Sequence, residues 1–322
     1  MLQLIDNLVV YLANLAPPDT WLNQPQIVKG LLAVVLVCFV CGAVGSQVVA
    51  NRMAFFSDAL AHCAFAGIGL ALLVGLVARL GRDSEFYRWG VPLIMVLFGV
   101  LIGIGIAFVR ERTGLASDTV IGVFFAGAIG FGAMLLQALH TRAYLSPEAF
   151  LFGDPIFVSP SDLFMLIVLA LVTAAVLMWI YNGLVFTSFN PSLARSRRIS
   201  MRLYNYVFII LLALIVNLTL KTVGVLLINA LLVVPAATAA NLSRNMRQMF
   251  WLSIALALGA GLLGAWIATD FGLPDPATGQ TIHFGWAGTI VVVSVLLFFG
   301  SMILQPVIKA KGIARTRAAT PA

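Results

Sequence analysis

An aspartate and a histidine lie four residues apart within the stretch SDALAHCAFAG, as Asp58 and His62. If this stretch is helical, the two side chains share one face of the helix. A carboxylate and an imidazole supply the oxygen and nitrogen donors that Zn²⁺ and Mn²⁺ both accept, and zinc favours four ligands. The spacing therefore predicts half of a metal site.

A second copy of the chain would complete this site if the two copies met on a twofold axis near the helix. Asp58 and His62 would then each be contributed twice, which makes a transient four-ligand site. The structural alternative is that Asp58 caps the start of a membrane span and that His62 bonds a neighbouring carbonyl group. The spacing alone leaves both interpretations open.

The composition predicts what kind of element must position this pair. The chain has 322 residues, of which 61% are hydrophobic and 10% charged. An average soluble domain carries about 25% charged residues, so the composition excludes a water-soluble fold. Apolar runs of about 20 residues, the length that crosses a bilayer, occupy residues 30–50, 59–78, 89–109, 119–139, 163–183, 203–220, 222–243, 248–269 and 286–308.

These runs predict an all-α fold, a polytopic transmembrane helical bundle with eight or nine spans. The uncertainty in the number lies at Lys221, where the junction between two runs is tight. Residues 203–243 are therefore either two spans or one span and a broken or re-entrant helix. A break of this kind is tolerated only where the backbone faces protein or water.

The distribution of charge indicates the orientation in the membrane. If the C-terminus is cytoplasmic and each run spans once, most of the 19 Lys and Arg residues lie in cytoplasmic segments. The net charge of +7 therefore implies no nucleic-acid partner. We divide the chain into an N-terminal interfacial segment (1–26), a transmembrane domain (27–308) and a basic cytoplasmic tail (309–322).

Two further features bear on mechanism. The sequence has no G-x-x-x-x-G-K-[ST] motif, so the chain lacks a P-loop for nucleotide phosphates. Pro235, in LLVVPAATAA, removes a helical hydrogen bond and predicts a kink. A kinked span either moves and lines a pore or is static, and the sequence leaves both open.

Four stretches, in this order, resemble the permease family of bacterial ABC importers for zinc, manganese and iron. They are GSQVVANRMAFFSDALAHCAFAGIGLA at 45–71, SDTVIGV at 117–123, AFLFGDPIFVSPSDL at 149–163 and VGVLLINALLVVPAATAANLSRNMRQM at 223–249. The similarity covers nearly the whole chain. Asp58 and His62 match the family motif position for position, so the resemblance implies that they contact the metal. The LFGD and PAATA stretches resemble the zinc-uptake branch.

The resemblance implies a channel-forming subunit in the bacterial inner membrane that is not itself an enzyme. It implies a homodimeric or pseudo-dimeric pore, separate cytoplasmic ATPase subunits and an extracytoplasmic metal-binding protein. The cargo is then a divalent ion, Zn²⁺ first with Mn²⁺ or Fe²⁺ as the alternative, moved by alternating access without a permanently bound cofactor. A secondary transporter driven by an ion gradient is the remaining rival, and it predicts more buried ionisable residues than this pair.

The segment between residues 182 and 202 carries a cluster of arginines and is predicted to lie on the cytoplasmic side. An Asn-Pro pair within it is typical of a helix start. A short basic helix there suits contact with an ATPase subunit or with anionic membrane lipid. The candidate ATPase-coupling residues are Asn190, Pro191, Ser192, Leu193 and Ala194.

Overall fold

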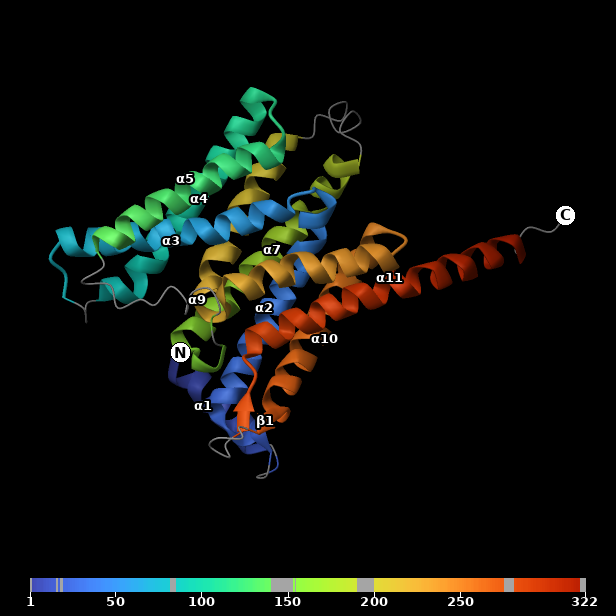
Figure 1. Ribbon diagram of the computed structural model, residues 1–322, viewed down its shortest axis with the longest axis horizontal. Helices are drawn as coiled ribbons and strands as arrows, with labels where there is room; N and C mark the ends of the chain where they lie inside the picture. The colour runs from blue at the N-terminus through green and yellow to red at the C-terminus, as the bar shows by residue number, and fades with distance from the viewer. Residues whose placement is uncertain are drawn as a thin grey trace.

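The computed structural model describes residues 2–15, 17, 20–81, 85–139, 153, 155–189, 200–274 and 281–318. It is almost entirely helical (Figure 1). The α-helices are α1 (Leu2–Leu15), α2 (Pro25–Ala50), α3 (Ala54–Val77), α4 (Val91–Thr113), α5 (Ser117–Ala138), α7 (Pro160–Phe189), α9 (Met201–Leu242), α10 (Met246–Asp270) and α11 (Trp286–Ala318). The short elements are η1 (Trp21–Asn23), η2 (Phe86–Gly90), η3 (Pro155–Phe157) and an antiparallel pair of strands, β1 (Gly272–Pro274) and β2 (Thr281–His283).

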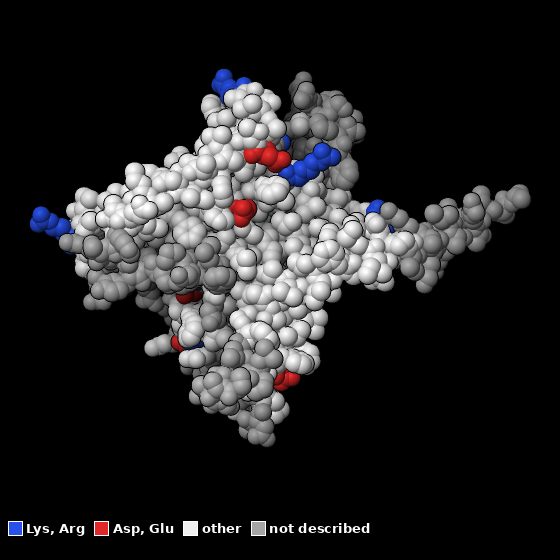
Figure 2. Space-filling view, in the orientation of Figure 1, with Lys and Arg blue, Asp and Glu red and all other residues white. Residues whose placement is uncertain are grey.

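Eight helices of the described residues are long and apolar enough to cross a membrane. The predicted all-α transmembrane bundle is therefore confirmed. Figure 2 shows one face of the molecule, on which charged side chains are sparse and most of the described surface is uncharged. Such a surface suits contact with lipid, because lipid chains offer no compensation for a charge.

Helix α9 explains why the expected number of spans was eight or nine. It has 42 residues, or about 63 Å at 1.5 Å per residue, which is twice a bilayer core of about 30 Å. Its dihedral angles are non-helical at Gly224, where φ is 79° and ψ is 162°. The runs 203–220 and 222–243 are thus the two arms of one broken helix, seen in Figure 1 as two segments at a steep angle.

The break is packed closely against the residues that precede α7. A Cβ atom on Gly153 would lie 2.3 Å from the backbone nitrogen of Gly224, so the two backbones are in direct contact. The carbonyl group of Pro155 approaches Gly30, near the start of α2, in the same way. The start of α2, the segment before α7 and the break in α9 therefore lie together.

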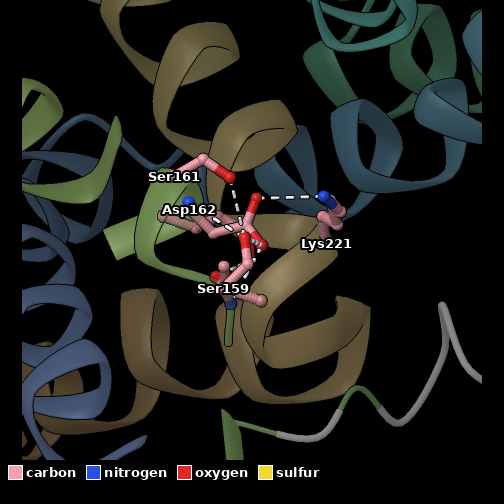
Figure 3. A network of polar contacts seen from close by, with 6 residues as sticks. Ser159, Ser161, Asp162 and Lys221 are labelled. Carbon is pink, nitrogen blue, oxygen red and sulfur yellow. Dashed lines mark hydrogen bonds and ion pairs between the residues drawn. The ribbon is translucent and has the colours of Figure 1, made fainter. Parts of the chain in front are cut away.

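A polar cluster holds the start of α7 to the first arm of α9 (Figure 3). The Asp162 backbone N–H donates to Oγ of Ser159 at 3.3 Å, and the Ser159 backbone N–H donates to Oδ2 of Asp162 at 3.3 Å. These reciprocal bonds form a capping box at the start of the helix. The Lys221 ammonium group donates to Oδ1 of Asp162 at 2.9 Å, which ties the two helices together beside the break.

Pro235 lies buried in the second arm of α9. The residue with non-helical dihedral angles in this helix is Gly224 and not Pro235. The location of the break is therefore set by a glycine that the sequence analysis did not single out. A role for Pro235 as a pore kink stays a prediction.

The two ends of the chain extend the bundle. Helix α1 packs against α2 and α7, with Val9 and Ala13 fully buried, and Asp6 forms an ion pair with Lys29 of α2. Its position at the membrane interface stays a prediction. Helix α11 continues to Ala318, well beyond its apolar window of Trp286–Pro306, so most of the basic tail continues this helix.

Replacement of Gly224 should destabilise the protein. We expect Gly224→Ala to cost about 1–3 kcal/mol, because its dihedral angles belong to a region that essentially only glycine adopts. The matched control is Gly259→Ala in α10, where an added Cβ meets open space and removal of glycine from a helix interior favours folding by roughly 0.5–1 kcal/mol.

The measurement is the apparent melting temperature of each variant purified in detergent. Gly224→Ala should melt below the wild type and Gly259→Ala at or above it. Equal melting temperatures for Gly224→Ala and the wild type would contradict the assignment of the break.

Candidate metal site

Asp58 and His62 lie in the second and third turns of α3 and face the same side. The helix is capped by Met53, without a side-chain hydrogen bond, so Asp58 does not cap the span. Nδ1 of His62 lies 3.0 Å from the Asp58 carbonyl oxygen and 3.5 Å from Oδ1 of the Asp58 carboxylate. The structural alternative had His62 bonded to a backbone carbonyl group. That contact is present, and so is the predicted pairing of His62 with the Asp58 carboxylate.

The environment of His62 keeps the imidazole in a fixed orientation. The rings of His62 and Phe125, from α5, meet in a T-shaped arrangement with the centroids 5.0 Å apart, and the ring of Phe65 is tilted against the imidazole at 6.3 Å. The side chain of His62 is 24% exposed and that of Asp58 is 43% exposed. Because Nδ1 makes the contacts to Asp58, Nε2 is the nitrogen through which His62 could bind a metal.

A third polar residue completes the group, and sequence reasoning missed it. Asn229, in the second arm of α9, donates from Nδ2 to Oδ1 of Asp58 at 2.5 Å, across 171 residues of sequence. Its own Oδ1 is buried and has no hydrogen-bond partner among the described residues. The signal was a lone polar side chain in the apolar run VGVLLINALLVV, which is costly in a membrane unless it has a partner.

The arrangement places a carboxylate, an imidazole and an amide carbonyl oxygen close to one another. Within the part of the chain that the structure describes, no three His, Cys, Asp or Glu side chains form a metal-binding group. The predicted completion of the site by a second copy therefore stays a prediction. The candidate coupling residues 190–194 lie outside the described residues.

A model of the family described as the ABC 3 transport family matches residues 23–305. The chain belongs to the ABC 3 transport family. The match extends across the eight candidate spans, from α2 to the end of the apolar part of α11. The protein is therefore a multi-pass membrane protein of the ABC transporter class, and the expected importer permease family is confirmed at this level.

Curated relatives of this ABC 3 chain match most of its length. The manganese import system permease protein ScaB of Streptococcus gordonii is 29% identical over 278 residues, which are 86% of this chain and 91% of the relative. The manganese transport system membrane protein MntC of Listeria innocua is 26% identical over 86% of this chain and 90% of the relative. A probable iron transport system membrane protein of Haemophilus influenzae is 27% identical over 84% of this chain and 95% of the relative.

A solved structure shares the fold of this ABC 3 chain. It is PsaBC from Streptococcus pneumoniae in complex with Fab, which matches with a TM-score of 0.70 and 24% sequence identity. The match covers 88% of this chain and 95% of the other. The helices of this chain therefore have the same overall arrangement as those of that structure.

Asn229 should contribute to metal binding through Asp58. We expect Asn229→Leu to weaken Mn²⁺ binding by about 10–100-fold, the usual effect of removing a group that orients a metal ligand. The control is Thr238→Val in the same arm, because the Thr238 hydroxyl donates only to the Val234 carbonyl of its own helix.

Mn²⁺ binding to the purified variants is measured by electron paramagnetic resonance, which separates free from bound ion. Thr238→Val should bind like the wild type. Binding by Asn229→Leu that matches the wild type would remove Asn229 from the site.

Proposed function

We propose that this chain is the permease subunit of an ABC importer that carries a divalent transition-metal ion, with Mn²⁺ as the principal cargo. The observation that carries the proposal is the Asp58–His62 pair on α3, joined to Asn229 of α9. Membership of the ABC 3 transport family supplies the transport class.

The charge of Asp58 is what makes the group suited to a cation. Asp162, in the first turn of α7, is neutralised by Lys221. Asp58 instead contacts a neutral amide and an imidazole, so its negative charge is not balanced by a lysine or arginine among the described residues. A divalent ion bound by the free carboxylate oxygen would provide that balance.

The donor types favour manganese over zinc. Carboxylate, carbonyl and water oxygens suit Mn²⁺, whereas zinc sites favour thiolate and imidazole. The described group offers oxygen from Asp58 and Asn229 and one nitrogen from His62. The curated relatives are named for manganese and iron transport, so this proposal departs from the zinc cargo expected from the sequence and takes up its alternative.

The proposed assembly has two copies of the membrane subunit and separate partners. One copy provides too few ligands for a closed site, and the 43% exposure of Asp58 leaves its carboxylate accessible to a second copy. Cytoplasmic ATPase subunits would supply the energy, and an extracytoplasmic metal-binding protein would deliver the ion. ATP binding would then open the central site alternately to the two sides of the membrane.

Removal of the chain should change the metal content of the cell selectively. We expect deletion to lower total cellular manganese several-fold and to leave zinc within its normal range, as measured by inductively coupled plasma mass spectrometry during growth in metal-limited medium. A fall in zinc with normal manganese would restore the zinc assignment. No change in either metal or in iron would reject the proposed function.

His62 should be required for transport and not for assembly. In the deletion strain, we expect His62→Ala to lower the initial rate of ⁵⁴Mn uptake by at least about tenfold, because the group loses its nitrogen ligand. His140→Ala, a change at a histidine outside the pair, is the matched control and should restore normal uptake.

Both variants are compared at equal amounts of membrane-inserted protein, verified by immunoblot. Normal uptake by His62→Ala would retain the importer assignment and return His62 to a structural role.

A further inference from the structure

A large apolar groove lies between α2, α7 and α10, away from the candidate metal site. Its volume is about 730 Å³. Phe39 of α2, Leu177 and Met178 of α7, and Phe250 and Trp251 of α10 form much of its wall. None of the three polar residues of the metal site lines it, so its function is a separate question.

One end of the groove is polar and basic. Arg247, in the first turn of α10, and Asn182, near the end of α7, line this end. Arg247 is exposed and forms no ion pair with any described residue. Beside it the Tyr181 hydroxyl donates to the Met246 carbonyl at 3.5 Å, which joins the two helices that flank the groove.

An aromatic wall leads from this end into the groove. The ring of Phe250 meets Tyr181 edge-on at 5.2 Å between centroids and meets Trp251 edge-on at 5.4 Å. Trp251 is 61% exposed although it lies within a membrane-crossing helix. Tyrosine and tryptophan gather where a membrane protein passes from the hydrocarbon core to the headgroup layer, which assigns this end of the groove to that boundary.

The length of the groove matches one leaflet. Along α7 its lining extends from Thr173 to Val185, which at 1.5 Å per residue is about 18 Å. Half of the hydrocarbon core is about 15 Å. Both residues belong to the apolar span Pro160–Phe186, so the groove runs from the middle of the span to its end.

We propose that this groove binds a phospholipid with an anionic headgroup, with an acyl chain along α7 and α10 and the phosphate at Arg247. The occupant has to be apolar over the depth of a leaflet and negatively charged at the boundary, and an anionic phospholipid is the component of a bilayer with both properties. The guanidinium group pairs with phosphate in a bidentate manner. The face proposed above for a second copy belongs to α3, which does not line the groove.

The lipid would bridge α7 and α10, which the hydrogen bond from Tyr181 to Met246 joins beside the groove. The end of α7 and the start of α10 both belong to the predicted cytoplasmic side. Binding therefore fixes the spacing of these two helix ends without entering the metal site.

The test is native mass spectrometry of the full chain, purified in detergent and titrated with phosphatidylglycerol or phosphatidylcholine. We expect tight retention of phosphatidylglycerol by the wild type and a loss of about fivefold in affinity for Arg247→Gln, since one basic side chain near an anionic headgroup accounts for roughly this factor. Arg244→Gln is the matched control, because Arg244 is exposed, lies three residues away and does not line the groove.

A second variant tests the apolar part. Ala174→Trp places a large side chain in the groove and should reduce retention of both lipids, while size-exclusion chromatography verifies that the variant remains folded. Equal retention of phosphatidylglycerol by the wild type, Arg247→Gln and Arg244→Gln would overturn the proposal, as would an efficient disulfide between two copies of Trp251→Cys, because the groove would then be an interface between protomers.

Discussion

The contact between the backbones of Gly153 and Gly224 is the constraint on which the arrangement of the remaining helices depends. A membrane tolerates non-helical backbone only where protein or water surrounds it. Helix α9 meets this condition because the segment before α7 closes over its break, and the Asp162–Lys221 ion pair holds that segment in place. With the break fixed, each arm has its own set of neighbours. The first arm meets α4, where Asn217 fits against Gly99, and the second meets α2 at Gly45.

The second arm in turn determines the candidate metal site. Asn229 reaches Asp58 because the arm leaves the break at an angle that brings it beside α3. At about 63 Å, a straight helix of 42 residues could not keep both arms among the neighbouring spans of one bilayer, whose core is about 30 Å thick. The polar group at Asp58 is therefore a product of a backbone feature far from it in sequence.

The sequence predicted those features that depend on local pattern. Spans follow from apolar runs, and the shared face of Asp58 and His62 follows from helical periodicity. The location of the break did not follow. The chain has 28 glycines and 13 prolines, and the positive φ of Gly224 is imposed by its neighbours in space. Pro235 was the more conspicuous helix breaker, yet a proline within a span can be accommodated when surrounding helices satisfy the freed carbonyl group.

Asn229 shows the same limit in the candidate site. Its amide was visible as a polar residue in an apolar run, but its partner lies 171 residues away, and one sequence contains no information on that pairing. Motif comparison likewise could not distinguish zinc from manganese as the cargo. Sites for the two ions share the carboxylate and the imidazole and differ in the remaining donors.

The broken helix also determines how far each part of the second arm would move if that arm rotated about Gly224. Asn229 lies about 7 Å from Gly224 along the arm, while the far end, at Leu242, lies about 27 Å away. A rotation of about 10° at the pivot displaces Asn229 by about 1 Å and Leu242 by about 5 Å. A displacement of the first size is enough to break a hydrogen bond to Asp58. A small displacement at the candidate metal site and a large one at the opposite end of the arm would thus be two measures of one such rotation.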